Sequence, residues 1–184
     1  MSPTITVHRP DIEDPPVEPV TLAPRSELPE DARLLLVDNG KAKARDLLLY
    51  LAAELKQRLP IGSVEVVSKP SAGAPLEDDQ VSELAARSDL VIAGLGDCGA
   101  CSACSLQDAL LFERAGVPST VLITEVFIAN IARFSQALGC PGYHSLVVPH
   151  PAATKSEAQL RQFAASVADA ACDQLRSRAL AGVS

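Results

Sequence analysis

Three cysteines lie close together in this chain, in the run Cys98-Gly99-Ala100-Cys101 and then at Cys104. Two residues between Cys98 and Cys101 allow their sulfur atoms to meet across a turn. A helical pattern follows, and the unpaired N–H groups at a helix N-terminus stabilise a thiolate. We therefore expect Cys98 to be a nucleophile and Cys101 to resolve its adduct. Cys104 repeats the spacing and could relay the disulfide or face the core.

The same three thiols permit a second interpretation, a metal site. Three thiolates can hold an iron–sulfur cluster or Zn²⁺, with Cys98, Cys101 and Cys104 as ligands. A fourth ligand is missing from the sequence neighbourhood, so His150 or Cys140 could supply it only through the fold. No cofactor is firmly implied. The first turn has no G-x-G-x-x-G fingerprint and the chain has no phosphate loop, although flavodoxin-like sheets bind flavin without one strict motif.

The stretch before the cysteines must position them. Leu90–Ala93 is apolar throughout, which suits a buried strand of a parallel sheet. Gly94, Gly96 and Gly99 allow either a positive φ or a close backbone approach in the turn that follows. The sequence thus predicts a strand, a glycine turn carrying the thiols, and a helix that starts behind them.

This strand–helix unit is one of five. Four further runs have the composition of strands: Arg33–Val37, Val64–Val67, Val117–Thr124 and Ser145–Val148. Helical patterns follow the five runs, at about 42–59 and 76–87, from the cysteine turn to about 115, and at about 125–138 and 156–180. Such alternation predicts an α/β fold, a three-layer, doubly wound parallel sheet with helices on both faces. We expect the flavodoxin-like strand order 2-1-3-4-5.

In such a sheet the carboxyl ends of the strands share one edge, where ligands bind. His150 follows the fifth strand and Glu125 the fourth, and either could move a proton. Lys41 and Asn39 follow the first strand and could hold a substrate. The remaining candidates for substrate contact also lie at strand ends: Asp38, Gly96, Asp97, Gly99 and Thr124.

Bulk composition narrows the class of protein. The 184 residues suffice for one domain with a full core. A net charge of −7 without a basic patch argues against nucleic acid and anionic membranes as partners. No run reaches transmembrane length, and the N-terminus lacks a signal-peptide pattern. We therefore expect a cytoplasmic protein. In that reducing compartment the five cysteines, an odd number, suggest reactive or metal-binding thiols rather than a structural disulfide framework.

Residues 1–30 are rich in proline and predict an extended arm, ahead of a single α/β domain over residues 31–184. The arm is either a mobile tail or a strap laid across a second subunit. The second interpretation predicts a homodimer with exchanged arms. It rests on apolar residues spaced along the arm that could anchor it: Ile5, Val7, Ile12, Val17, Val20 and Leu22.

The run Gly94-Leu95-Gly96-Asp97-Cys98-Gly99-Ala100-Cys101 resembles the signature of the UGSC-like family, named for selenocysteine-Gly-Ser-Cys. The resemblance covers about residue 33 to the C-terminus and leaves the arm outside. It also includes three other stretches: Asp38–Lys41, Asp108-Ala109 and the region of Thr124 and Phe127. The family is described only as candidate oxidoreductases. It is distantly similar to the selenoprotein subunit of glycine and proline reductases, which cleave a carbon–nitrogen bond reductively.

Carried over by this resemblance, Cys98 stands where the selenocysteine would be, and Cys101 matches the family cysteine. Ala100 replaces the serine, and sulfur is a weaker nucleophile and leaving group than selenium. We therefore predict a thiol-dependent oxidoreductase or lyase that acts on a small polar molecule and is recycled by an external thiol reductant. The alternatives are a metalloprotein and a non-catalytic subunit of a larger reductase complex.

Overall fold

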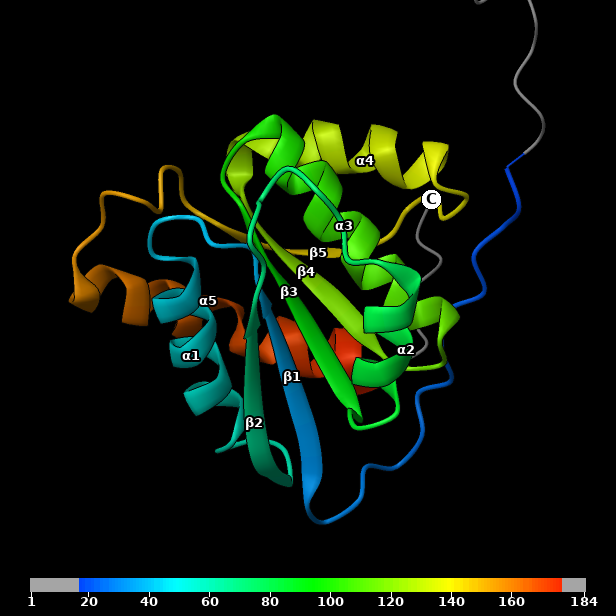
Figure 1. Ribbon diagram of the computed structural model, residues 1–184. Helices are drawn as coiled ribbons and strands as arrows, with labels where there is room; N and C mark the ends of the chain where they lie inside the picture. Colours follow the sequence, from blue (N-terminus) through cyan, green and yellow to red (C-terminus); the bar gives the residue numbers. More distant parts are fainter. Residues whose placement is uncertain (1–16, 177–184) are drawn as a thin grey trace, which may run out of the picture.

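A five-stranded parallel sheet lies between two layers of helices in the computed structural model, which describes residues 17–176 (Figure 1). The strand order is β2-β1-β3-β4-β5, and every neighbouring pair is parallel. The predicted flavodoxin-like order is therefore confirmed. The strands are β1 (Ala32–Asp38), β2 (Ile61–Ser68), β3 (Leu90–Gly96), β4 (Ser119–Thr124) and β5 (Ser145–Val148).

A helix follows each strand. The helices are α1 (Ala44–Leu55), α2 (Asp78–Ala85), α3 (Gly99–Arg114), α4 (Ile128–Ala137) and α5 (Glu157–Arg176). A short 3₁₀ helix, η1 (Glu125–Phe127), precedes α4 where the sequence predicts a continuous helix. The predicted end of the last helix lies outside the described residues. Across residues 17–176, no helix has the length and apolar character needed to span a membrane.

Two apolar cores lie on the two faces of the sheet. On one face, α1 and α5 cover the inward side chains of β1 and β3 (Figure 1). Leu47, Leu48, Leu51 and Leu55 of α1 are fully buried there, as their helical spacing predicts. On the other face, α2, α3 and α4 form a second core with the opposite side chains of the same strands. Strands β1, β3 and β4 are therefore buried on both faces of the sheet.

Strand β3 runs through the middle of the sheet and is buried along its whole length. Gly94 and Gly96 belong to this strand, so the prediction that they form the turn is wrong, and the turn starts at Asp97. Neither glycine, nor Gly99, has a positive φ. Gly96 instead provides close approach, because a Cβ there would lie 2.7 Å from atoms of Ile123 and the Ser102 hydroxyl.

The described part of the arm, residues 17–30, packs on its own chain. Val20 and Leu22 contact the core formed by α2, α3 and α4. The Val20 N–H donates to the Gly139 carbonyl at 2.8 Å. Val17 is exposed, and the other predicted anchors lie outside the described residues. Exchange of the arm between subunits therefore stays a prediction.

A buried polar network secures the arm, and we call it the arm cluster: Arg25, Glu113, Ser119 and Tyr143. The Arg25 guanidinium donates to both carboxylate oxygens of Glu113. Glu113 also accepts the N–H groups of Ala23 at 2.7 Å and Ser119 at 2.9 Å. The Tyr143 hydroxyl donates to the Ser119 carbonyl at 2.7 Å. Since Ser119 starts β4, this network lies at the amino edge of the sheet, opposite the cysteine turn.

Candidate functional site

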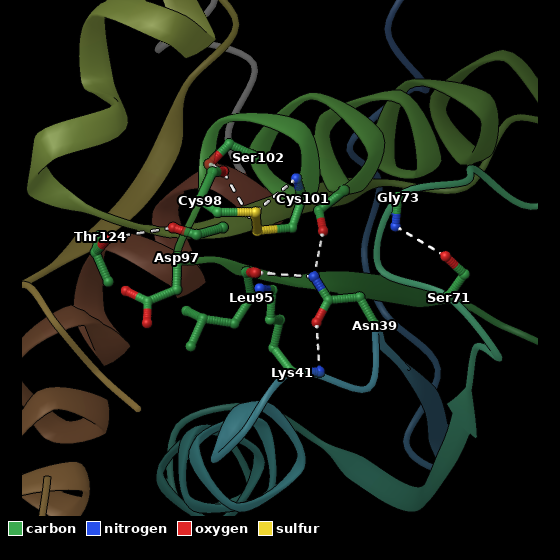
Figure 2. Close-up of a disulfide and its surroundings, with 12 residues drawn as sticks. Asn39, Lys41, Ser71, Gly73, Leu95, Asp97, Cys98, Cys101, Ser102 and Thr124 are labelled. Carbon is green, nitrogen blue, oxygen red and sulfur yellow. Dashed lines mark hydrogen bonds between the residues drawn. A yellow bond between two sulfur atoms is a disulfide. The ribbon is translucent and has the colours of Figure 1, made fainter. Parts of the chain in front are cut away.

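Cys98 is the N-cap of α3 and has an extended backbone. Its sulfur accepts the N–H of Cys101 at 3.2 Å, and the two sulfur atoms lie at disulfide distance, with the Cα atoms 5.4 Å apart (Figure 2). Cys98 is partly exposed, whereas Cys101 is fully buried. Cys98 is therefore the sulfur that an external molecule meets first.

Hydrogen bonds on the buried side hold the cysteine turn in place. The Ser102 hydroxyl donates to the Cys98 carbonyl at 2.7 Å. The Asn39 side-chain amide donates to the Leu95 carbonyl at 2.8 Å and to the Ser105 hydroxyl at 3.1 Å (Figure 2). Asn39 is only 1% exposed, and both of its amide hydrogens are thereby used. It ties the loop after β1 to β3 and α3.

Asp38 and Lys41, the other two predicted residues at the end of β1, differ in burial and in the direction of their side chains. Asp38 is buried, and its two oxygens accept the Gly40 N–H at 2.9 Å and the Ser68 hydroxyl at 2.7 Å. Lys41 is half-buried, and its side chain extends past Leu95 toward the disulfide (Figure 2). Asp38 therefore stabilises the loop through its hydrogen bonds. Lys41 is the residue of this loop whose positively charged side chain extends toward the cysteines.

Four polar residues from three strand ends meet beside Cys98, and we call them the strand-tip cluster: Asp97, Thr124, Glu125 and His150. His150 Nδ1 lies 3.0 Å from Asp97 Oδ1 and 3.0 Å from Thr124 Oγ1. Glu125 Oε1 accepts the His150 backbone N–H at 3.3 Å. The carboxyl ends of β3, β4 and β5 thus converge as the sheet topology requires.

Cys104 lies in the second turn of α3, near a buried ion pair that the sequence did not reveal. Lys69 donates to Asp108 and to the Ala74 carbonyl, and both charged side chains are buried. Burial raises the pKa of the Asp108 carboxyl, and Lys69 opposes that rise. Burial likewise raises the pKa of the Cys104 thiol. Cys104 is therefore a poorer nucleophile at neutral pH than an ordinary cysteine.

The donor set for a metal ion is incomplete around these thiols. Within residues 17–176, no three His, Cys, Asp or Glu side chains are placed to hold a metal ion. Cys140 is buried ahead of β5, at the sheet edge opposite the cysteine turn. His150 turns its Nδ1 toward Asp97. The interpretation of Cys98, Cys101 and Cys104 as metal ligands therefore stays a prediction.

A model of the UGSC family matches residues 6–177. The chain belongs to the UGSC family. The match extends into the arm, so the expectation that the arm lies outside the family resemblance is wrong. Among curated proteins, none matches this UGSC chain. Its similarity to the selenoprotein subunit of glycine and proline reductases stays a prediction.

Solved structures that resemble this UGSC protein include two flavodoxin-like proteins. One is a diflavin flavoprotein A3 from Nostoc sp., with 18% identity over 81% of this chain and 97% of that chain and a TM-score of 0.43. The other is a flavodoxin-like domain from Synechococcus sp., with 12% identity over 75% and 96% and a TM-score of 0.37. The flavodoxin-like sheet of this UGSC protein, with a Cys-x-x-Cys pair at a strand end, is compatible with a redox function.

Proposed function

We propose that this UGSC protein is a thiol-dependent oxidoreductase or lyase, in which Cys98 and Cys101 deliver two electrons to a small polar substrate. One observation carries the proposal: the two sulfur atoms lie at disulfide distance where α3 begins, and only Cys98 is partly exposed. A helix N-terminus stabilises a thiolate, and the buried neighbour is placed to attack the first sulfur. A nucleophilic thiol must be accessible to the substrate, and a resolving thiol must lie next to it, as Cys98 and Cys101 do.

The reaction starts from the dithiol form. The Cys98 thiolate attacks an electrophilic atom of the substrate and forms a covalent bond to it, while the bond from that atom to a leaving group breaks and the leaving group departs with that electron pair. The Cys101 thiolate then attacks Cys98 Sγ, so that the bond between sulfur and substrate breaks and the disulfide forms. The substrate fragment leaves with the electron pair and takes up a proton. An external dithiol reduces the disulfide by exchange and is itself oxidised, which restores both thiols.

The surrounding residues divide into those that act on substrate and those that hold the turn. Lys41 supplies a positive charge for a carboxylate or another anionic group of the substrate. His150 exchanges the proton of the leaving fragment. We assign Asn39 and Asp38 to holding the turn, because these two side chains are buried and already hydrogen-bonded. Such chemistry suits a reducing compartment such as the cytoplasm.

The test uses 5,5′-dithiobis(2-nitrobenzoate) as the electrophile, because thiol exchange with it releases a coloured thionitrobenzoate. In the reduced wild-type protein, Cys98 forms a mixed disulfide and Cys101 displaces the second thionitrobenzoate. We expect Cys101→Ser to stop after the first release and to keep the adduct on Cys98, detected by peptide mass spectrometry. Cys98→Ser should lose the fast phase, since Cys101 is buried.

Cys104→Ser is the matched control, because this thiol lies on the same helix and has a raised pKa. It should keep the fast release and the Cys98–Cys101 disulfide. A Cys101→Ser protein with no adduct on Cys98, or a wild-type protein that keeps its adduct, would contradict the proposal.

A further inference from the structure

We infer that Asp97 and Thr124 are positioning residues that keep the hydrogen of the His150 ring on Nδ1, so that His150 exchanges protons only at Nε2. This inference deepens the proposed function and rests on it for its role in the reaction. The geometry beneath it is independent of the cysteines. It consists of two oxygen atoms, each 3.0 Å from the same ring nitrogen.

One of the two oxygens belongs to a carboxylate and the other to a hydroxyl, but both favour a hydrogen on Nδ1. A carboxylate can only accept hydrogen bonds, so Asp97 Oδ1 requires a hydrogen on Nδ1. The Thr124 hydroxyl donates its own hydrogen to the Gly96 carbonyl at 3.3 Å, which leaves an oxygen lone pair for His150. The Thr124 oxygen therefore accepts from Nδ1, and the Asp97 charge favours a hydrogen on the same nitrogen. The neutral ring is left with its unprotonated nitrogen at Nε2.

The oxygens themselves are held firmly. The Asp97 side chain is 8% exposed, and its Oδ1 also accepts the Ala152 N–H at 3.4 Å. Thr124 is the last residue of β4 and is fully buried. Neither side chain is free to follow the ring. The geometry is therefore imposed on the histidine by the sheet and does not depend on a bound molecule.

The ring is restrained on its other sides but keeps access to solvent. Glu125 holds the His150 backbone N–H, and Phe127 meets the ring edge-on at a centroid distance of 5.8 Å. The His150 side chain nevertheless remains 34% exposed. Asp97 and Glu125 are the charged groups within hydrogen-bond distance of His150 among the described residues. Since Asp97 directly precedes Cys98, the positioning carboxylate and the reactive thiol belong to one turn.

In the proposed reaction this arrangement gives the proton a defined route. Unprotonated Nε2 accepts the proton that a thiol loses on becoming a thiolate. Protonated Nε2 then donates it to the substrate fragment when the disulfide forms. Asp97, which the sequence suggested as a substrate contact, would act through His150 instead of touching the substrate.

The experiment is ¹⁵N NMR of the full-length protein labelled at histidine, with His150→Gln to assign its ring signals. Above the ring's titration, we expect the Nδ1–H form of His150 to exceed the Nε2–H form by about tenfold or more, because its partner is a charged acceptor. Asp97→Asn removes the negative charge beside Nδ1, and Thr124→Val removes an acceptor. Each should increase the Nε2–H share several-fold, and Thr124→Ser should restore the wild-type ratio.

A wild-type protein with mainly Nε2–H, or equal ratios in wild type, Asp97→Asn and Thr124→Val, would overturn the inference. These spectra need no thiol reagent and can be recorded on the disulfide form. The thionitrobenzoate experiment in turn does not depend on the histidine signals. Failure of the positioning role and failure of the cysteine chemistry are therefore separate results.

Discussion

The two polar clusters of this protein lie at opposite edges of one sheet and differ in how far their side chains are exposed to solvent. In the arm cluster, the side chains of Glu113 and Arg25 are 0% and 5% exposed, and both carboxylate oxygens are bonded. In the strand-tip cluster, His150 is about one-third exposed and Glu125 lies on the surface. The difference indicates that a saturated buried network holds the chain together, whereas a partly open one can exchange protons with a ligand.

The largest effect on stability should follow from opening the arm cluster. Arg25→Ala leaves the buried Glu113 carboxylate without its counter-charge, which should lower the free energy of unfolding by about 3–5 kcal/mol. Denaturant unfolding measures this change. Arg87→Ala is the matched control, because Arg87 pairs with Glu65 and Glu83 at the surface and its loss should change little. Equal losses of unfolding free energy in the two variants would contradict the idea that the buried ion pair stabilises the fold more than the exposed one.

A second variant tests packing beneath the strand-tip cluster. Gly96→Ala would place a Cβ 2.7 Å from Ile123 and from the Ser102 hydroxyl, which itself bonds to the Cys98 carbonyl. We expect a loss of about 1–3 kcal/mol of unfolding free energy and a slower thionitrobenzoate release. Gly73→Ala is the control, since its nearest neighbour would be the Ser71 hydroxyl at an ordinary 3.7 Å. Unchanged stability in Gly96→Ala would show that the turn tolerates displacement.

The smallest expected effect is a loss of stability at alkaline pH, caused by Tyr143 of the arm cluster. Burial, and then the Glu113 charge, raises the pKa of Tyr143 well above 10. Above pH 10 the unfolded chain loses this proton and the folded chain keeps it, so stability should fall by up to about 1.4 kcal/mol per pH unit. Tyr143→Phe should flatten that slope in unfolding curves recorded at successive pH values. Tyr50→Phe, at a partly buried site on the other face, should retain it.

Much of the fold could be predicted because its signals are local. The leucine spacing of α1 and the apolar run before the cysteines each lie within a few residues of sequence. The strand-end rule also brought Asp97, Glu125 and His150 to one place without any pairwise information. These features depend on periodicity and on topology, which a single sequence contains.

The residues that sequence reasoning missed or misassigned depend on distant partners. Arg25 and Glu113 are 88 positions apart, and Lys69 and Asp108 are 39 apart, so no local pattern links them. Asn39 follows a strand in a polar loop, which is typical of a ligand contact. Its amide instead turns inward to Leu95, and only the packed structure decides between these directions.

Helix α3 begins directly after Cys98 and ends at Arg114, one residue beyond Glu113. Its 16 residues span about 24 Å, a length over which an α-helix behaves as a rigid rod. Because Arg25 binds Glu113 at the C-terminal end of α3, it also limits the displacement of the N-terminal end, which follows Cys98. In this way Arg25, in the described part of the proline-rich arm, helps to hold the turn that carries Cys98 at the opposite edge of the sheet.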